Sequence, residues 1–394
     1  MMKLPHWGVT FLIAGTCIGG AVIALPITLS PLGLLWGWGM MIFMALIGYG
    51  TAKIGIALQQ DAPGSTNLPT LARQYGSFKL QILSHLYIKG LSTTLLVLYT
   101  TAGAEVLNRL LQHFLAWTLL SDSQMISLYF LITLAILNAP FKKVDLMNRV
   151  LFTMMILGFL LLIAALLSQI SFTTLPLMNN NFCGVKSWSL AIPTAFTSFG
   201  FQLALHTAAF LCPQEAALKR SILWGLVIST AVYLLWTTGV LGALFGHAPD
   251  FYNNMAAGKA PIGQTIQHLS GLVGWPFFAF LVWGVSFLAI FTSNIGIGLA
   301  FIYGTGGQKK NFKQICFQLL PIYGASLFFK SSILSILTFA GMISAIGAIV
   351  IPCLLFQKRF PQRWRGWLVL LWGCALLVFA SELVSIFTNE LLSI

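Results

Sequence analysis

Long apolar stretches separated by short polar segments dominate this sequence. Most of them reach the roughly 20 residues that an α-helix needs to cross a lipid bilayer. No polar segment is long enough to form a separate soluble domain. The pattern therefore predicts an all-α polytopic membrane protein with eleven transmembrane helices. We place them at residues 7–30, 32–58, 81–106, 124–140, 148–169, 188–211, 220–246, 272–304, 313–329, 332–356 and 366–388.

The composition agrees with a chain that lies in lipid. Hydrophobic residues make up 58% of the 394 residues and charged residues only 7%, whereas a soluble domain carries about 25% charged residues. The first apolar stretch continues to Leu29 and ten more follow, so we interpret it as an uncleaved span and not as a signal peptide. The six cysteines are scattered singly. Nothing in the sequence indicates a metal, a cofactor or a nucleic-acid partner.

The positions of the basic residues predict the orientation. The net charge is +13, and 16 of the 21 Lys and Arg residues fall in one set of alternate loops, against 4 in the other set. Cytoplasmic loops carry the excess of Lys and Arg in membrane proteins. We therefore expect a cytoplasmic N-terminus and a C-terminus on the opposite side.

Two of the predicted spans are interrupted by residues that disfavour helix. The first contains Gly15, Thr16, Gly19 and Gly20, and the sixth contains the stretch 193–202 with proline, hydroxyl residues and glycine. In a single span, glycines can simply allow close helix packing. Matched interruptions at the first position of two five-helix sets indicate a secondary transporter with inverted repeats. The predicted organisation is a first repeat at 1–170, a second at 171–357, and one additional C-terminal helix within 358–394.

Interrupted helices suit a particular kind of ligand. Unwound backbone in a membrane leaves N–H and C=O groups free, which is tolerated only where they line a cavity. A helix N-terminus favours a carboxylate, and the carbonyl end of a helix favours a cation. An amino acid carries both charges, so the sequence predicts a zwitterionic amino acid as the substrate.

Several stretches resemble one family in the order in which they occur. They are Ala14–Gly20 followed by Ala24–Pro26, Val144–Phe152, Phe196–Phe201 and Thr292–Ser293. Together they resemble bacterial aromatic amino acid permeases, the tyrosine- and tryptophan-specific transport proteins of the amino acid/polyamine/organocation superfamily. The resemblance implies the leucine-transporter-type 5+5 fold. It also implies proton-driven import of tyrosine, tryptophan or phenylalanine across the bacterial cytoplasmic membrane, with the C-terminus in the periplasm.

The candidate substrate-binding residues lie at the two interruptions and in the third span. For each of them the alternative is a packing role, and Tyr99 could equally be an interfacial or packed tyrosine. The candidates are Gly15, Thr16, Gly19, Gly20, Ala21, Tyr99, Thr197, Ser198, Phe199, Gly200 and Gln202.

A second set of residues is a candidate for ion coupling. Thr292 and Ser293 could join carbonyls near Ala14 and Cys17 in an oxygen cage for sodium, or could hydrogen-bond to their own helix. Two titratable residues are candidates for proton transfer. They are Glu105, which could instead pair with Arg109, and His206, which could instead be simply hydrogen-bonded. Glu382 is expected to be peripheral.

Two positions depart from the family pattern. Gln202 stands where the family often has histidine, and Met155 stands where a lysine is expected that replaces a bound sodium in related carriers. Proton and sodium coupling therefore both remain open, as does exchange of another neutral amino acid. A membrane enzyme is disfavoured because no catalytic motif is present. A channel or a non-transporting subunit would not require matched interruptions.

Overall fold

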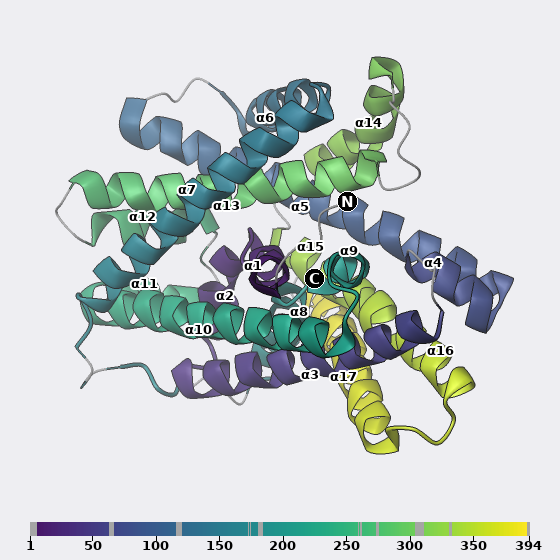
Figure 1. Cartoon of the computed structure of the whole chain (residues 1–394). Helices are drawn as coiled ribbons and strands as arrows, with labels where there is room; N and C mark the ends of the chain where they lie inside the picture. The colour runs from purple at the N-terminus through teal and green to yellow at the C-terminus, as the bar shows by residue number, and fades with distance from the viewer. Residues whose placement is uncertain are drawn as a thin grey trace.

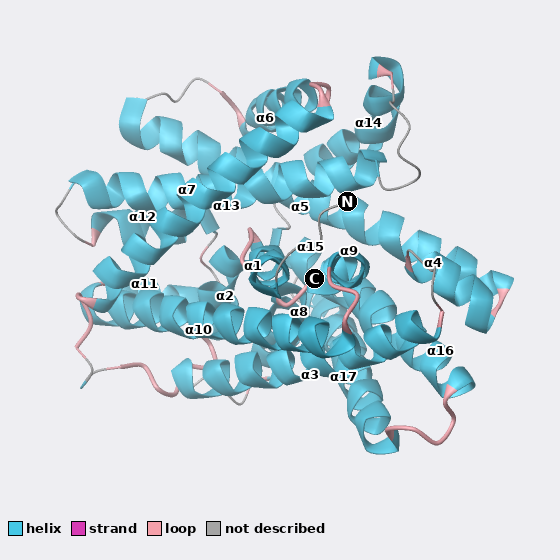
Figure 2. Cartoon of the chain, viewed as in Figure 1, coloured by secondary structure: helices cyan, strands magenta, loops and turns pink. Residues whose placement is uncertain are grey.

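The computed structural model describes residues 6–62, 67–115, 120–171, 173, 175–179, 184–258, 260, 262–272, 276–303, 311–330 and 333–391. Within these residues all regular secondary structure is helical (Figure 2). The α-helices are α1 (His6–Cys17), α2 (Ala21–Leu29), α3 (Leu34–Asp61), α4 (Leu68–Leu71), α5 (Phe78–Leu115), α6 (Asp122–Leu137), α7 (Phe141–Leu167), α8 (Val185–Ser198), α9 (Leu205–Leu211), α10 (Glu215–His247), α11 (Pro249–Ala256), α12 (Ile262–Gly271), α13 (Pro276–Tyr303), α14 (Phe312–Phe328), α15 (Ile333–Ala345), α16 (Ile351–Arg359) and α17 (Arg365–Leu391). Short π-helical and 3-10 segments are η1 (Ala72–Gly76), η4 (Phe201–Ala204) and η5 (Ile346–Val350).

Each predicted apolar stretch coincides with a helix or with consecutive helices, and the prediction of an all-α polytopic membrane protein is confirmed. Within the described residues, seven helical segments are long and apolar enough to span a membrane, and the bent pair α1–α2 makes up to eight. The shorter α6, α14 and the α8–α9 pair are the other predicted spans. The count of eleven stays a prediction.

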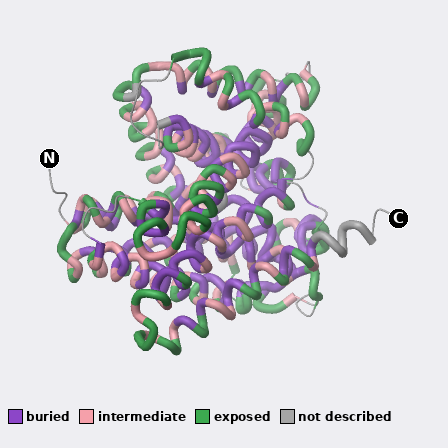
Figure 3. The backbone as a smooth tube through the Cα atoms, turned by 90° about the vertical axis from the view of Figure 1, so that its right-hand side faces the viewer, coloured by how far each residue is buried: buried purple, intermediate pink, exposed green. Residues whose placement is uncertain are grey.

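The outer surface of the helix assembly is apolar. On α7, Leu146, Val150, Met154, Leu157 and Leu161 are all more than half exposed. Their spacing of three or four residues places them along one side of the helix. Such a stripe would be unfavourable in water and matches the hydrocarbon of a bilayer. Figure 3 shows the corresponding arrangement, with buried backbone inside and exposed segments outside.

Two helices are broken where the sequence predicted interruptions. α1 ends at Cys17 and α2 begins at Ala21, and the two axes are bent by 52°. α8 ends at Ser198, and Phe199 and Gly200 lead into η4 and α9. Gly200 has an ordinary negative φ. A Cβ there would lie 2.8 Å from the Thr197 carbonyl oxygen, so the turn requires glycine because of crowding.

The broken helices lie at the centre of the assembly (Figure 1). α1 packs along α10, which also packs along α3. α5 packs against α13, α6 and α14, while α8 packs against α15, α17 and α2. The short helices η1, α11 and α12 connect longer ones and were not predicted.

Candidate functional site

A cavity of about 390 Å³ lies at the two helix breaks. Residues from α1, α5, α8 and α13 line it, although they are far apart in the sequence. The structure brings together these predicted residues on its wall: Gly15, Thr16, Cys17, Gly19, Tyr99, Thr197, Gly200, Thr292 and Ser293.

The cavity extends from the breaks toward the face where α1 begins. Along α5 the lining includes Leu91, Leu95 and Tyr99, in the first part of that helix. Along α13 it runs from Thr292 to Ala300, in the last part of that antiparallel helix. The predicted topology assigns this face to the cytoplasm.

The break in the first helix is packed closely against α5 and α13. The Gly20 N–H donates a hydrogen bond of 2.9 Å to Ser293 Oγ. A Cβ on Gly20 would lie 2.7 Å from a ring carbon of Tyr99, and one on Gly19 would lie 2.8 Å from Ser293 Oγ. Side chains at these two glycines would therefore push the break away from its neighbours.

The carbonyl end of α1 lies on the cavity wall. The Ala14 carbonyl accepts from the Ile18 N–H, and the Cys17 carbonyl accepts from the Gly19 N–H. Among the described residues, the carbonyls of Gly15 and Thr16 at this helix end accept no hydrogen bond from outside α1. The last carbonyls of a helix carry partial negative charge. This end of α1 can therefore receive a cationic group from the cavity.

Tyr233 of α10 joins the two breaks and was missed by the sequence analysis. Its buried hydroxyl lies 2.6 Å from the Cys17 carbonyl oxygen and 2.6 Å from the Ser198 carbonyl oxygen. These carbonyls end α1 and α8. One hydroxyl has one proton, so the two acceptors share it. A single tyrosine in an apolar helix carries no sequence signal for this role.

The hydroxyls proposed for a sodium cage are engaged within their own helix. Thr292 Oγ1 donates to the Leu288 carbonyl and Ser293 Oγ donates to the Ala289 carbonyl, both at 2.8 Å. Ser293 Oγ also accepts the Gly20 N–H. This geometry matches the alternative interpretation, and the cage stays a prediction.

The rest of the lining combines apolar surface with neutral polar groups. Leu91, Leu95, Phe152 and Leu203 provide apolar side chains. Asn148 was not predicted as a site residue, and its buried Oδ1 has no hydrogen-bond partner among the described residues. An amide one turn before Phe152 in an apolar span is the signal that could have identified it. The described lining contains no Asp, Glu, Lys, Arg or His.

Several predicted site residues are not on the wall of this cavity. Ser198 and Phe199 are buried, and Phe199 packs against Tyr233. Gln202 is absent from the described lining, and His206 is hydrogen-bonded to Gln59. Ala14 is buried in α1. The side chain of Ala21 lies outside the described part of the structure.

The candidate acids and Met155 also lie away from the cavity wall. Glu105 Oε1 accepts the Gly263 N–H at 3.0 Å and lies 3.6 Å from Arg109 Nε, as the pairing alternative predicted. Met155 belongs to the buried core. Glu382 in α17 is only 4% exposed, and its Oε2 has no hydrogen-bond partner among the described residues. Glu382, which was expected to be peripheral, is therefore buried, whereas Glu105 and His206 are only partly buried.

Comparison with known proteins assigns the chain to a family. The chain is 27% identical to the tyrosine-specific transport system 1 of Haemophilus influenzae over 92% of each chain. It is 24% identical to the tryptophan-specific transport protein of Pseudomonas aeruginosa, over 93% of this chain and 92% of that protein. It is also 24% identical to glutamine transporter 2 of Aliivibrio fischeri, over 89% of this chain and 88% of that protein. The model of the tryptophan/tyrosine permease family matches residues 2–387. The chain therefore belongs to the tryptophan/tyrosine permease family.

Proposed function

We propose that this protein is a secondary active transporter that imports an aromatic amino acid, with tyrosine as the first candidate and tryptophan and phenylalanine as the others. The single observation that carries the proposal is the uncharged cavity at two broken helices. Family membership and relatives named for tyrosine and tryptophan transport support it. A transporter, and not an enzyme, is the function class that these relatives support.

The cavity offers separate partners for each part of an amino acid. The Gly15 and Thr16 carbonyls at the end of α1 would receive the ammonium group together with Asn148 Oδ1, which has no hydrogen-bond partner among the described residues. The N–H groups that open α2 would receive the carboxylate, which would replace Ser293 Oγ at the Gly20 N–H. Tyr99, Phe152 and nearby leucines would contact the aromatic ring. In this proposal backbone groups and neutral side chains hold both charges of the zwitterion.

The proposed transport cycle is alternating access across a 5+5 inverted repeat, with halves at 1–170 and 171–357. The helices α1, α2, α3, α8, α9 and α10 would move as one group against α5, α6, α13 and α14. The extensive packing of α1 with α10 and of α5 with α13 supports this grouping. Tyr233 supports it as well, because it links the two breaks within the first group.

For coupling we favour a proton over sodium. The Ser293 hydroxyl both accepts the Gly20 N–H and donates within its helix, and the Ala14 and Cys17 carbonyls also accept hydrogen bonds. These hydrogen bonds occupy part of the acceptor capacity that a sodium cage would use. Glu105, His206 and the buried Glu382 are the candidate proton carriers.

A flux experiment tests the proposal. Proteoliposomes with purified protein should show saturable uptake and counterflow of labelled tyrosine, driven by an inward proton gradient without sodium. A panel of the twenty amino acids as competitors identifies the substrate. Strongest competition by glutamine would shift the assignment toward the relative named for that amino acid. The absence of saturable counterflow for every amino acid would refute the transporter proposal, and strict sodium dependence would refute proton coupling.

A further inference from the structure

A second cavity, of about 570 Å³, lies on the opposite side of the helix breaks. Along α5 its lining starts at Thr101 and ends at Gln112, whereas the central cavity ends at Tyr99. Along α15 its lining contains Ser335, whereas the central cavity reaches Ser344. We name this second space the vestibule. The predicted topology places it on the periplasmic face.

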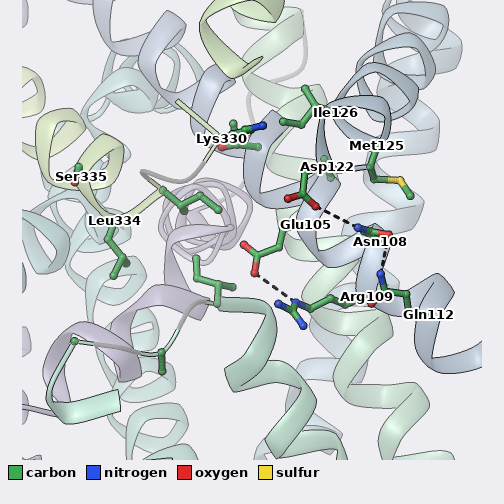
Figure 4. A pocket seen from close by; sticks show the side chains of 16 residues that line it. Glu105, Asn108, Arg109, Gln112, Asp122, Met125, Ile126, Lys330, Leu334 and Ser335 are labelled. Carbon is green, nitrogen blue, oxygen red and sulfur yellow. Dashed lines mark hydrogen bonds and ion pairs between the residues drawn. The ribbon is translucent and has the colours of Figure 1, made fainter. Parts of the chain in front are cut away.

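The vestibule is lined by charged groups, unlike the central cavity. It contains the two acids Glu105 and Asp122 and the two bases Arg109 and Lys330. Figure 4 shows the carboxylates of Glu105 and Asp122 between the side chains of Lys330 and Arg109. Two acids and two bases leave no net formal charge. Such a set attracts a molecule with one positive and one negative end more than it attracts a simple anion or cation.

Only two of these four charged side chains form an ion pair with each other. Glu105 and Arg109 lie 3.6 Å apart and form an ion pair. Asp122 accepts only a long hydrogen bond of 3.5 Å from Asn108 Nδ2, and Lys330 Nζ lies 3.5 Å from Ser123 Oγ. Within the described residues neither Asp122 nor Lys330 has an ion-pair partner. Both are exposed, so an incoming ligand can reach them.

The remaining wall suits the side chain of an aromatic amino acid. Met125, Ile126, Ile262 and Leu334 line the vestibule beside the charged groups. The volume falls in the range of roughly 300–1,000 Å³ that is usual for small-molecule sites. Glu105 is six residues beyond Tyr99 on α5, a rise of about 9 Å. A molecule held here would therefore be close to the central cavity but still outside it.

We propose that the vestibule is a separate capture site for the zwitterionic amino acid, in which Lys330 attracts the carboxylate and Asp122 attracts the ammonium group. The inference rests on the proposed transport function. Capture by opposite charges raises the local substrate concentration and the rate of association, and it weakens with ionic strength. The uncharged central cavity then selects the substrate by its shape and backbone groups.

Asp122→Asn and Lys330→Gln test the proposal in right-side-out membrane vesicles with labelled tyrosine. Each variant should raise the KM for uptake about threefold or more at low salt, with Vmax changed by less than about twofold, because charges at a binding rim act mainly on association. Raising the ionic strength from about 0.01 to 0.5 M should raise the wild-type KM toward that of the variants, because added salt shortens the Debye length and so screens the charges of the vestibule. Asp145→Asn and Lys143→Gln remove the same charges on the opposite face and should leave the KM unchanged.

Two partial analogues of the substrate make the test specific to each charge. Phenylpropionate has the carboxylate without the amine, and phenethylamine has the amine without the carboxylate. Lys330→Gln should weaken inhibition by phenylpropionate only, and Asp122→Asn should weaken inhibition by phenethylamine only. An unchanged KM, or equal effects on both inhibitors, would overturn the capture site. Wild-type vesicles that take up no aromatic amino acid would instead overturn the proposed function.

Discussion

At the scale of single residues, the central cavity depends on how closely side chains approach the broken backbone. Gly19 and Gly20 allow Ser293 and Tyr99 to lie against the break. Asn148 contributes an amide oxygen that has no hydrogen-bond partner among the described residues. The sequence indicated the glycines because glycine disfavours helix. It did not indicate Asn148 as a ligand, because the direction of its side chain depends on how α7 packs.

Gly19→Leu should lower initial uptake of labelled tyrosine at least tenfold, since a Cβ at Gly19 would already lie 2.8 Å from Ser293 Oγ. A tenfold loss corresponds to about 1.4 kcal/mol of lost substrate or transition-state binding. Uptake by cells expressing each variant measures the effect, with the amount in the membrane determined by immunoblot. Gly39→Leu is the matched control, because a Cβ at Gly39 meets no atom within 4 Å. Normal uptake by Gly19→Leu would refute the assignment of this site.

At the scale of elements, hydrogen bonds and ion pairs hold separate helices at fixed positions. Tyr233 joins the carbonyl ends of α1 and α8 from a third helix. On the face where α1 begins, Asp61 at the end of α3 accepts from Arg359 at the end of α16 and from Tyr75 in η1. Burial, followed by the hydrogen bond to Asp61, raises the pKa of Tyr75 to about 12.

Tyr233→Phe should destabilise the protein by about 1–3 kcal/mol, because it leaves a buried carbonyl without its donor. Uptake should also slow, since the two breaks lose their shared hydrogen bond. Thermal unfolding in detergent and initial uptake rates measure the two effects. Tyr87→Phe is the control: Tyr87 is also buried, and its hydroxyl has no hydrogen bond recorded to the described residues. Equal stability and uptake for both variants would exclude a linking role for Tyr233.

Asp61→Asn should lower stability only slightly, because the Asp61 and Arg359 side chains are 23% and 48% exposed and water screens the pair. Unfolding at about 0.02 and 0.5 M salt should show the difference from wild type shrinking as the salt rises. Asp145→Asn removes an ion pair within α7 alone and should have a smaller effect. A loss that is large and independent of salt would contradict this account.

At the scale of the whole molecule, two cavities with different chemistry lie on opposite sides of the helix breaks. The central cavity has no ionised side chain among its described lining residues, while the vestibule has four. The two linings therefore differ in charge as well as in position. In the predicted topology an imported substrate meets charged groups first and backbone groups second.

Cysteine labelling tests that topology. In a variant without native cysteines, Asp250→Cys in α11 should react with a membrane-impermeant maleimide in intact cells. Lys143→Cys near the start of α7 should react only after the membrane is permeabilised. Both positions are exposed, so access to the reagent depends on the side of the membrane. The reverse pattern would invert the predicted orientation.

The sequence by itself determined the features that depend on neighbours along the chain. The apolar stretches, the two interruptions and the family motifs can all be read within windows of a few residues, because lipid and helix geometry act on local segments. The sequence did not determine which side chains contact each other across distant helices. Tyr233 reaches Cys17 across 216 positions, and the vestibule combines Glu105, Asp122 and Lys330. Only the tertiary structure decided these contacts, because they depend on how helices distant in sequence pack together.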